Sequence, residues 1–369
     1  MSNASPDMRE TAATAATTAT TALGAAAARG EDMAMIRAAS DLTRDLNSPN
    51  RAVYWGDFLG SALVGYASMA GAIFADGWPA TFAFGVVSIL TLYRASLFIH
   101  ELTHMRLSAV PGFWTVWHIL VGIPLLVPSF MYEGLHNTHH MRRKYGTADD
   151  PEYLPLSHMK PWTLPAFVLI SLLGPLGLLI RYGILAPLSL VIPPLRTMVW
   201  ERFSGLVINP DFRRRAPEPA IARHVRLTEP PAAIWAMALI VMVASGIIPI
   251  AAFLTALAIV SGVMFLNQIR TLVAHLWDND GAEMSVTAQF LDTVNVPPPS
   301  PLPALWAPVG LRYHALHHLL PGLPYHALGE AHRRLAANLG GASTYARANR
   351  SGLPLLVGEL MRRSMGAGK

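Results

Sequence analysis

The chain has 369 residues, of which 52% are hydrophobic and only 14% are charged. A soluble domain usually carries about a quarter charged residues, so the composition indicates a membrane protein. The absence of cysteine excludes disulfides, thiolate zinc sites and iron–sulfur clusters held by the chain itself. Membrane topology explains the formal charge of +5 better than nucleic acid does, and we expect no nucleic-acid partner.

The chain begins with an Ala- and Thr-rich segment, residues 1–45, that has no basic region followed by an apolar core. A secretory signal is therefore not expected, and disorder is the simplest prediction. We divide the chain into this disordered segment, a membrane-embedded metal domain over residues 46–340, and a C-terminal tail over residues 341–369.

Long uncharged stretches follow in chain order, at residues 58–75, 77–93, 161–180 and 230–269. A membrane-spanning helix needs about 20 apolar residues, so the last stretch is expected to cross twice, with a turn near residues 245–249. Neither expected outer turn contains Lys or Arg, as the positive-inside rule requires if both termini lie inside. The prediction is an all-α integral membrane fold with four transmembrane helices arranged as two hairpins. The first two stretches form one hairpin, and residues 230–269 form the other.

Two further segments do not fit a simple crossing. Residues 107–132 are uncharged but contain three prolines, and residues 182–195 are too short to span. We expect both to be interfacial or re-entrant helices. Residues 161–180 are interrupted by Gly174 and Pro175, so the number of crossings stays open.

Histidines cluster in three places, each beside an apolar run, and we call each cluster a histidine box. The pattern H-x-x-x-H occurs once and H-x-x-H-H occurs twice. Residues three and four apart share one face of a helix, so each box is expected to aim all its imidazoles at one point. A single histidine at the end of the last apolar stretch lies at a matching depth. The candidate metal ligands are therefore His100, His104, His136, His139, His140, His275, His314, His317 and His318.

The choice of metal depends on how many histidines are used. Read alone, His100-Glu101-x-x-His104 matches the H-E-x-x-H pattern of zinc peptidases, with Glu101 as general base. That interpretation leaves the other clustered histidines without a role. Eight or nine neutral imidazoles suit two transition metals with open positions. Iron is favoured because it can change oxidation state and activate O2, which zinc cannot do.

Ligating imidazoles need partners that accept their other N–H. Carboxylates near the boxes are candidates for this role, although each is equally interpretable as a surface charge: Glu101, Glu133, Asp149, Asp150, Asp278 and Asp280. The histidines without paired spacing are expected to be structural: His118, His158, His224, His326 and His332.

In order, spacing and placement between apolar hairpins, the three boxes resemble those of the membrane fatty acid desaturase superfamily, over about residues 55–335. The resemblance implies four transmembrane helices, a cytosolic cap that carries the boxes, and a di-iron centre held by the nine histidines, with His275 as the ligand outside the boxes. The family's acyl-CoA desaturases place an Asn four residues before that histidine, where this chain has Thr271, so a water-mediated ligand would have to come from Asn267 or Asn279.

The resemblance further implies O2-dependent oxidation of a lipid, and we expect desaturation of an acyl chain. The alternatives are a lipid hydroxylase or ketolase on the same site and, from another class, a membrane zinc metallopeptidase. Beyond the metal ligands, no catalytic residue is assigned.

No haem, flavin or ferredoxin module is visible in the sequence. Electrons are therefore expected from an external donor of ferredoxin, rubredoxin or cytochrome b5 type, docking on the basic inner face. We expect a multi-pass protein of a bacterial inner membrane, with its active site facing the cytoplasm.

Overall fold

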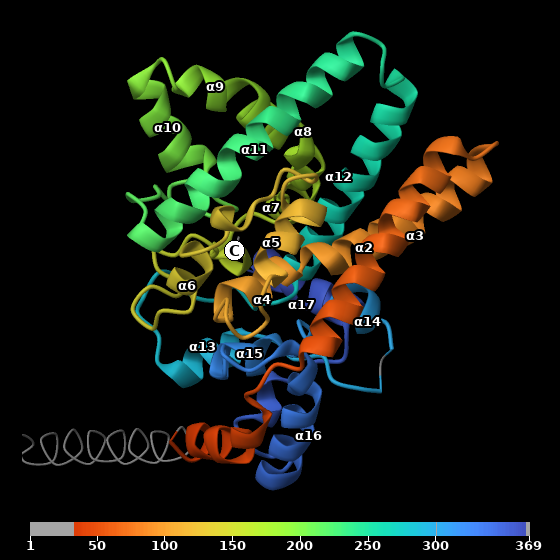
Figure 1. Ribbon diagram of the computed structural model, residues 1–369. Coiled ribbons are helices and arrows are strands. Elements are labelled where there is room, and N and C mark those ends of the chain that lie inside the picture. The colour runs from red at the N-terminus through yellow and green to blue at the C-terminus, as the bar shows by residue number, and fades with distance from the viewer. Residues whose placement is uncertain (1–32, 300, 367–369) are drawn as a thin grey trace, which may run out of the picture.

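The computed structural model describes residues 33–299 and 301–366, and within these residues every regular element is a helix (Figure 1). Four long helices form the frame: α2 (Arg51–Phe74), α3 (Trp78–Ser96), α11 (Pro219–Ala244) and α12 (Ile250–Leu272). The shorter helices are α4 (Phe98–His104), α5 (Phe113–Trp117), α6 (Leu135–His139), α7 (Thr163–Leu169), α8 (Gly174–Ile180), α9 (Ala186–Ser189), α10 (Pro193–Phe203), α13 (Val286–Asp292), α14 (Pro303–Trp306), α15 (His314–Leu319), α16 (Leu328–Leu339) and α17 (Leu353–Gly366).

Helices α2 and α3 form the first hairpin. The Asn50 side chain accepts hydrogen bonds from the first backbone N–H groups of α2, which fixes where that helix starts. The turn needs Gly77, whose φ of +92° is strained for other residues. Within the hairpin, a Cβ on Gly65 would lie 2.6 Å from the Leu92 side chain, so the two helices are in close contact. The predicted first hairpin is confirmed.

Helices α11 and α12 form the second hairpin. Helix α11 ends at Ala244 and α12 begins at Ile250, so the turn lies where Ser245, Gly246 and Pro249 predicted it. Helix α12 also packs on α3, since a Cβ on Gly262 would lie 2.5 Å from the Ile89 side chain. Figure 1 shows the tips of both hairpins pointing away from the short helices α4, α6 and α15, which gather at the opposite ends.

In the described part of the chain, five helical runs are long and apolar enough to cross a membrane, one more than the four predicted. The additional run is Thr163–Ser189, which includes the ambiguous stretch. It continues past Gly174 and Pro175 because Pro175 lies in the first turn of α8, where no intrahelical N–H is needed. Arg181 within this run is paired with Glu229 of α11 at 2.6 Å, which offsets its charge.

The two segments expected to be interfacial behave differently. Residues 107–132 contain only a short apolar helical run, Phe113–Gly122, which is too short to span a membrane. Of residues 182–195, the first eight belong to the run that ends at Ser189, and the last three begin α10. The interfacial prediction therefore fits the first segment and only the end of the second.

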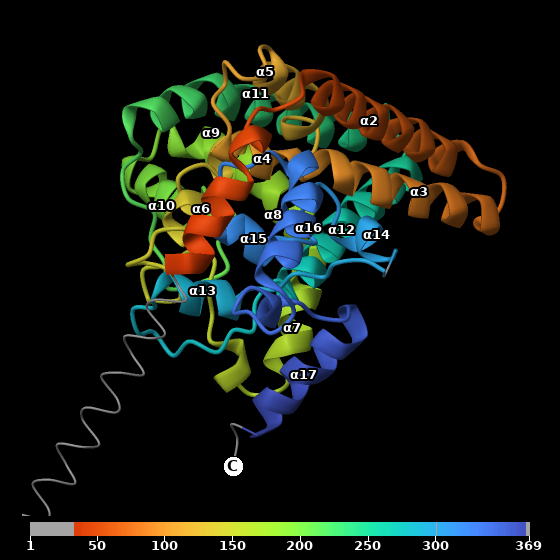
Figure 2. The ribbon, with the colours of Figure 1, turned by 90° about the horizontal axis from the view of Figure 1, so that it is seen from below.

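The first described helix, residues 33–42, lies beside α16, and the last, α17, lies beside α7 (Figure 2). Residues 33–42 are helical, and Met35 and Ala39 are buried against Leu335 and Tyr345. This part of the segment expected to be disordered is therefore ordered, whereas residues 1–32 lie outside the described residues. At the other end, α17 buries Leu356 and Leu360.

Candidate metal centre

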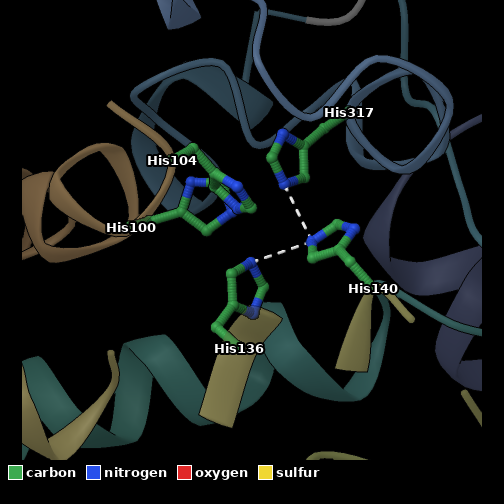
Figure 3. Close-up of side chains that lie close together, drawn as sticks. All are labelled: His100, His104, His136, His140 and His317. Atoms are coloured by element: carbon green, nitrogen blue, oxygen red, sulfur yellow. Dashed lines mark hydrogen bonds between the residues drawn. The ribbon is translucent and has the colours of Figure 1, made fainter. Parts of the chain in front are cut away.

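Five histidines from three separate helical segments converge to form the first group. His100 and His104 lie on α4, His136 and His140 lie on and directly after α6, and His317 lies on α15. One ring nitrogen from each lies within 4.8 Å of the others. Figure 3 shows the five rings arranged around a common point. We call these residues the five-histidine group.

The remaining four candidates form a second group beside the first. His139, His275, His314 and His318 also place one ring nitrogen each within 4.8 Å of the others, and we call them the four-histidine group. The rings of His140 and His318 lie 4.2 Å apart between centroids, so the two groups are neighbours.

The expectation that each box aims at a single point is wrong for the two H-x-x-H-H boxes. His136 and His140 join the five-histidine group, whereas His139 joins the four-histidine group. In the later box, His314 and His318 share one group and His317 joins the other. The physical reason is that adjacent helical residues point about 100° apart, so the two consecutive histidines of a box cannot face the same point.

The donor atoms fit a pair of cations. His140 Nε2 lies 3.0 Å from His136 Nε2 and 3.1 Å from His317 Nε2. The Nδ1 atom of His136 faces the Glu152 carboxylate at 3.1 Å and is best placed to donate its proton there, which leaves a lone pair on Nε2. In addition, both nitrogens of His100 and Nε2 of His104 are buried without a hydrogen-bond partner in the described structure. Converging lone pairs of this kind are favourable only around a positive ion.

Burial keeps most of these rings in the neutral form that binds metals. Burial, followed by the neighbouring imidazoles, holds the pKa of six histidines well below the usual value: His136, His140, His275, His314, His317 and His318. Burial acts on His139 in the same direction, but the charge and hydrogen bond of Asp150 outweigh it and raise its pKa. His139 is therefore the one among these seven rings that must lose a proton to a competing metal.

Carboxylates and tyrosines hold the outer nitrogens of several rings. Asp150, which is fully buried, accepts from His139 Nδ1 at 2.9 Å. Burial raises the pKa of Glu152, the partner of His136, to about 7. His275 Nδ1 contacts the Tyr145 hydroxyl at 2.8 Å, and that hydroxyl donates to Asp292 at 2.7 Å. These contacts fix ring orientation and tautomer, as partners of metal ligands do.

Backbone pairing brings His275 and Asp292 to the site. Residue 275 follows the end of α12 and forms an isolated antiparallel bridge with Thr293. Leu276 N donates to Asp292 O at 2.7 Å across this bridge, which places α13 beside the ring. On the next segment, the Asn295 side chain accepts from Leu316 N and so anchors α15.

Comparison with known proteins places this site in a family. Residues 76–348 match the fatty acid desaturase family. This protein belongs to the fatty acid desaturase family. The desaturase-family protein is also 49% identical over 333 residues to the ceramide hydroxylase of Caulobacter vibrioides (strain NA1000 / CB15N), an alignment that covers 90% of this chain and 94% of the relative.

Membership fixes the class of protein. The desaturase-family protein is a multi-pass membrane enzyme that desaturates or hydroxylates a lipid. Its all-α fold and its histidine clusters agree with that class. The zinc peptidase alternative has no support in the geometry, because Glu101 accepts hydrogen bonds from the Tyr54 hydroxyl and Tyr325 N instead of standing free as a base.

A cavity of about 450 Å³ lies beside the five-histidine group in the desaturase-family protein. This volume is within the range of about 300–1,000 Å³ typical of ligand sites. His100, Tyr132 and Glu152 line one part of its wall, and apolar side chains such as Val121 and Val263 line another. The cavity can therefore place an apolar chain next to the histidines.

Of the carboxylates proposed from the sequence, only Asp150 contacts a ring of the two groups within hydrogen-bond distance. Glu133 contacts His224 at 2.6 Å, and Asp149 pairs with Lys144 at the surface. Glu101 Oε1 lies 3.7 Å from His100 Nδ1, beyond hydrogen-bond distance. Asp278 is exposed and paired with Arg363, and Asp280 is exposed.

The sequence did not predict two carboxylates that support the histidine rings, Glu152 and Asp292. Glu152 lies two residues after Asp150, so the short Asp-x-Glu spacing behind the second box was an available signal. No local signal marked Asp292, because its approach to His275 depends on the bridge between residues 275 and 293.

The residues near His275 that were considered as water-mediated metal ligands have other contacts. Thr271 Oγ1 donates to the Asn267 carbonyl oxygen. Asn279 donates to the carbonyl oxygens of Gly146 and Ala282 and so braces a loop. Asn267 lines the cavity.

The five histidines expected to be structural belong to neither group, and each has a partner elsewhere. His118 lies between the Trp114 carbonyl oxygen and Ser129 N, while His326 accepts from Asn50 N. The other contacts join His158 to Asp278, His224 to Glu133 and His332 to Tyr345.

Proposed function

We propose that this enzyme hydroxylates the hydrocarbon part of a ceramide, with O2 as oxidant, at a di-iron centre. The observation that carries the proposal is the 49% identity, over nine-tenths of this chain, to a ceramide hydroxylase. The convergence of nine imidazoles beside an apolar cavity supports it.

Nine histidines would hold the two irons. We assign one iron to the five-histidine group and the other to the four-histidine group, which makes His275 a ligand like the box histidines. Five neutral nitrogen donors in one group exceed the four of a tetrahedral zinc site, which favours iron. Bound there, two irons would supply the redox chemistry that activates O2.

The chain's own contribution is to position the lipid and to exclude water. Apolar side chains such as Leu97, Val121 and Val263 make up most of the cavity wall, which suits a hydrocarbon chain. Asp150, Glu152 and Tyr145 hold the outer nitrogens of His139, His136 and His275, so that their inner nitrogens keep facing the centre. Pre-set geometry of this kind is what selective oxidation of one carbon requires.

Hydroxylation and desaturation differ in their balance of atoms. In hydroxylation one C–H bond breaks and one C–O bond forms; the second oxygen atom leaves as water, with two electrons and two protons from outside. In desaturation two C–H bonds break, a C=C bond forms, and both oxygen atoms leave as water, again with two electrons and two protons from outside. The relative's activity favours hydroxylation, and desaturation of an acyl chain stays the alternative on the same site.

The electrons would come from a separate protein. We propose a small donor of ferredoxin, rubredoxin or cytochrome b5 type, docking near the histidine end of the molecule. Arg142 and Arg143 follow the second box there, are exposed, and offer a positive surface for an acidic donor.

The same charge distribution supports an orientation. No Lys or Arg lies in the turn between α2 and α3 or in the turn between α11 and α12. The positive-inside rule then puts the histidine end on the cytoplasmic face of an inner membrane.

The decisive experiment is lipid mass spectrometry on cells that express the full chain and are supplied with a C16 dihydroceramide. Hydroxylation predicts a product heavier by about 16 Da, whereas desaturation predicts one lighter by about 2 Da. The His317→Ala variant should give neither product. An unchanged lipid with the unmodified enzyme and a working electron donor would refute the proposed substrate.

A further inference from the structure

The wall of the cavity changes character along one face of α12. Val260, Val263 and Met264 line its apolar part, while Asn267, Arg270 and Thr271 line the part nearer the end of the helix. Spacings of three and four residues place these side chains on one side of the helix. At 1.5 Å per residue, the stripe from residue 260 to residue 271 is about 16 Å long. The cavity is therefore amphipathic, like a lipid with one polar end.

Arg270 is the unusual residue in this wall. It is only 8% exposed, it lies in a helix apolar enough to span a membrane, and it lines the cavity. Its Nε has no hydrogen-bond partner among the described residues, and its guanidinium interacts with the Tyr93 hydroxyl but forms no ion pair with a carboxylate there. The Glu152 carboxylate is near enough to interact with its charge, but that carboxylate is hydrogen-bonded to His136.

Arg181 shows how this fold treats a buried arginine elsewhere. It also lines the cavity, but its guanidinium pairs with Glu229 at 2.6 Å and donates to Ser204 at 2.9 Å. No carboxylate of the described chain makes such a pair with Arg270. Burying an unpaired charge is costly, and such residues inside membranes commonly bind a ligand.

We propose that Arg270 is the positioning residue that binds the polar oxygens of the lipid in this cavity. Arginine is a donor only, so its partner must be an acceptor, and the amide carbonyl and hydroxyl oxygens of a ceramide are acceptors of the right kind. The inference rests on the proposed function and deepens it by naming the residue that sets which part of the lipid faces the histidines.

The position of attack follows from this placement. His100, Tyr132 and Glu152 line the cavity, and Thr271 of the polar stripe lies four residues before His275 of the four-histidine group, which follows the end of α12. The polar part of the lipid and the candidate metal centre are therefore at the same end of the cavity. The hydrocarbon beyond runs toward Val260 and Val263. The oxidised carbon should lie within a few bonds of the amide, and not in the middle of the chain.

Lipid binding to the full-length, metal-free protein in nanodiscs tests this role of Arg270, which we call the anchor, without relying on turnover. Arg270→Gln should weaken binding of C16 dihydroceramide roughly 10- to 100-fold, the range expected for losing a hydrogen bond from a charged donor. Binding of hexadecane, which has no acceptor, should stay within about twofold, and Arg270→Lys should recover part of the loss for dihydroceramide. The matched control is Arg226→Gln, which removes an exposed arginine of α11 that does not line the cavity.

The outcomes separate this inference from the proposed function. Equal losses for dihydroceramide and hexadecane in Arg270→Gln, or no loss for either, would overturn the anchor. A selective loss supports the anchor even if the enzyme gives no hydroxylated product, a result that counts only against the proposed function. Fragmentation of the product should place the new hydroxyl near the amide with the unmodified enzyme and at scattered positions with Arg270→Lys. A mid-chain hydroxyl from the unmodified enzyme would contradict the proposal.

Discussion

Asp149 and Asp150, which follow the second histidine box, offer a matched test at the level of single residues. Asp150 is fully buried and accepts hydrogen bonds from His139 Nδ1 at 2.9 Å and from Gly146 N at 2.8 Å. Asp150→Asn removes the charge that orients His139, so we expect iron affinity to fall roughly 10- to 100-fold, as it does when a partner of a ligand is lost. Metal analysis after dialysis against a graded chelator measures this.

Asp149→Asn is the control for that experiment. Asp149 is exposed and paired only with Lys144, and an exposed pair contributes about 0–1 kcal/mol. Its iron content should match that of the unmodified enzyme. Equal iron loss in both variants would mean that the loop as a whole, and not the His139 contact, supports the metal.

The lowered pKa values of the buried histidines predict how the stability of the metal-free protein responds to acid. An unfolded histidine has a pKa near 6.5, and in the folded state six of the ring pKa values lie well below that. As the pH falls below about 6.5, these six rings bind more protons in the unfolded chain than in the folded chain, which lowers folding stability. Three groups whose pKa values folding raises oppose this trend and are outnumbered: His139, Glu152 and Asp292. Thermal unfolding of the metal-free protein between pH 8 and pH 5 checks the sign, and a midpoint that rises toward acid would contradict it.

At the level of elements, the first hairpin depends on a close contact at Gly65. A Cβ there would lie 2.6 Å from the Leu92 side chain and 3.2 Å from its backbone N, and Leu92 is fully buried. Gly65→Ala should destabilise the protein by about 1–3 kcal/mol, the usual cost of overpacking. The measurement is the shift of the thermal unfolding midpoint in detergent.

Gly60→Ala is the matched control on the same helix. A Cβ at Gly60 would meet nothing within 4 Å, and alanine favours a helix more than glycine does. Its midpoint should stay the same or rise slightly. If both variants lowered the midpoint equally, helix contact at Gly65 would not be the cause.

The long elements were predictable because their signal is local. Uncharged runs and clustered helix breakers placed both hairpins and the turn at residues 245–249. The fifth candidate span was harder to recognise, because Arg181 falls inside it and its partner Glu229 lies on another helix. Only tertiary packing shows that such a charge is paired.

For the whole molecule, the histidines of the site could be selected from the sequence, but their arrangement could not. Box spacing identified eight of the nine rings that converge, and His275 was selected by its depth at the end of the last apolar stretch. The sorting of His139 and His317 away from their box neighbours follows from helix geometry, which the spacing already contained. Asp292, Tyr145 and Arg270 carried no pattern, since their roles depend on long-range contacts and on a shared cavity.

The orientation in the membrane can be tested directly because the chain has no cysteine. Asp76 lies exposed in the turn between α2 and α3, and Ala342 lies exposed beyond α16. In spheroplasts, an impermeant maleimide should label Asp76→Cys from outside, and Ala342→Cys only after lysis. The reverse pattern would place the histidine end on the outer face.

The central claim is that two irons are held by the two histidine groups, and metal analysis of the purified full-length enzyme tests it most directly. We predict about two irons per chain, falling to about one in His104→Ala and in His314→Ala, which each remove one donor from a different group. A single zinc per chain, retained in both variants, would contradict the account.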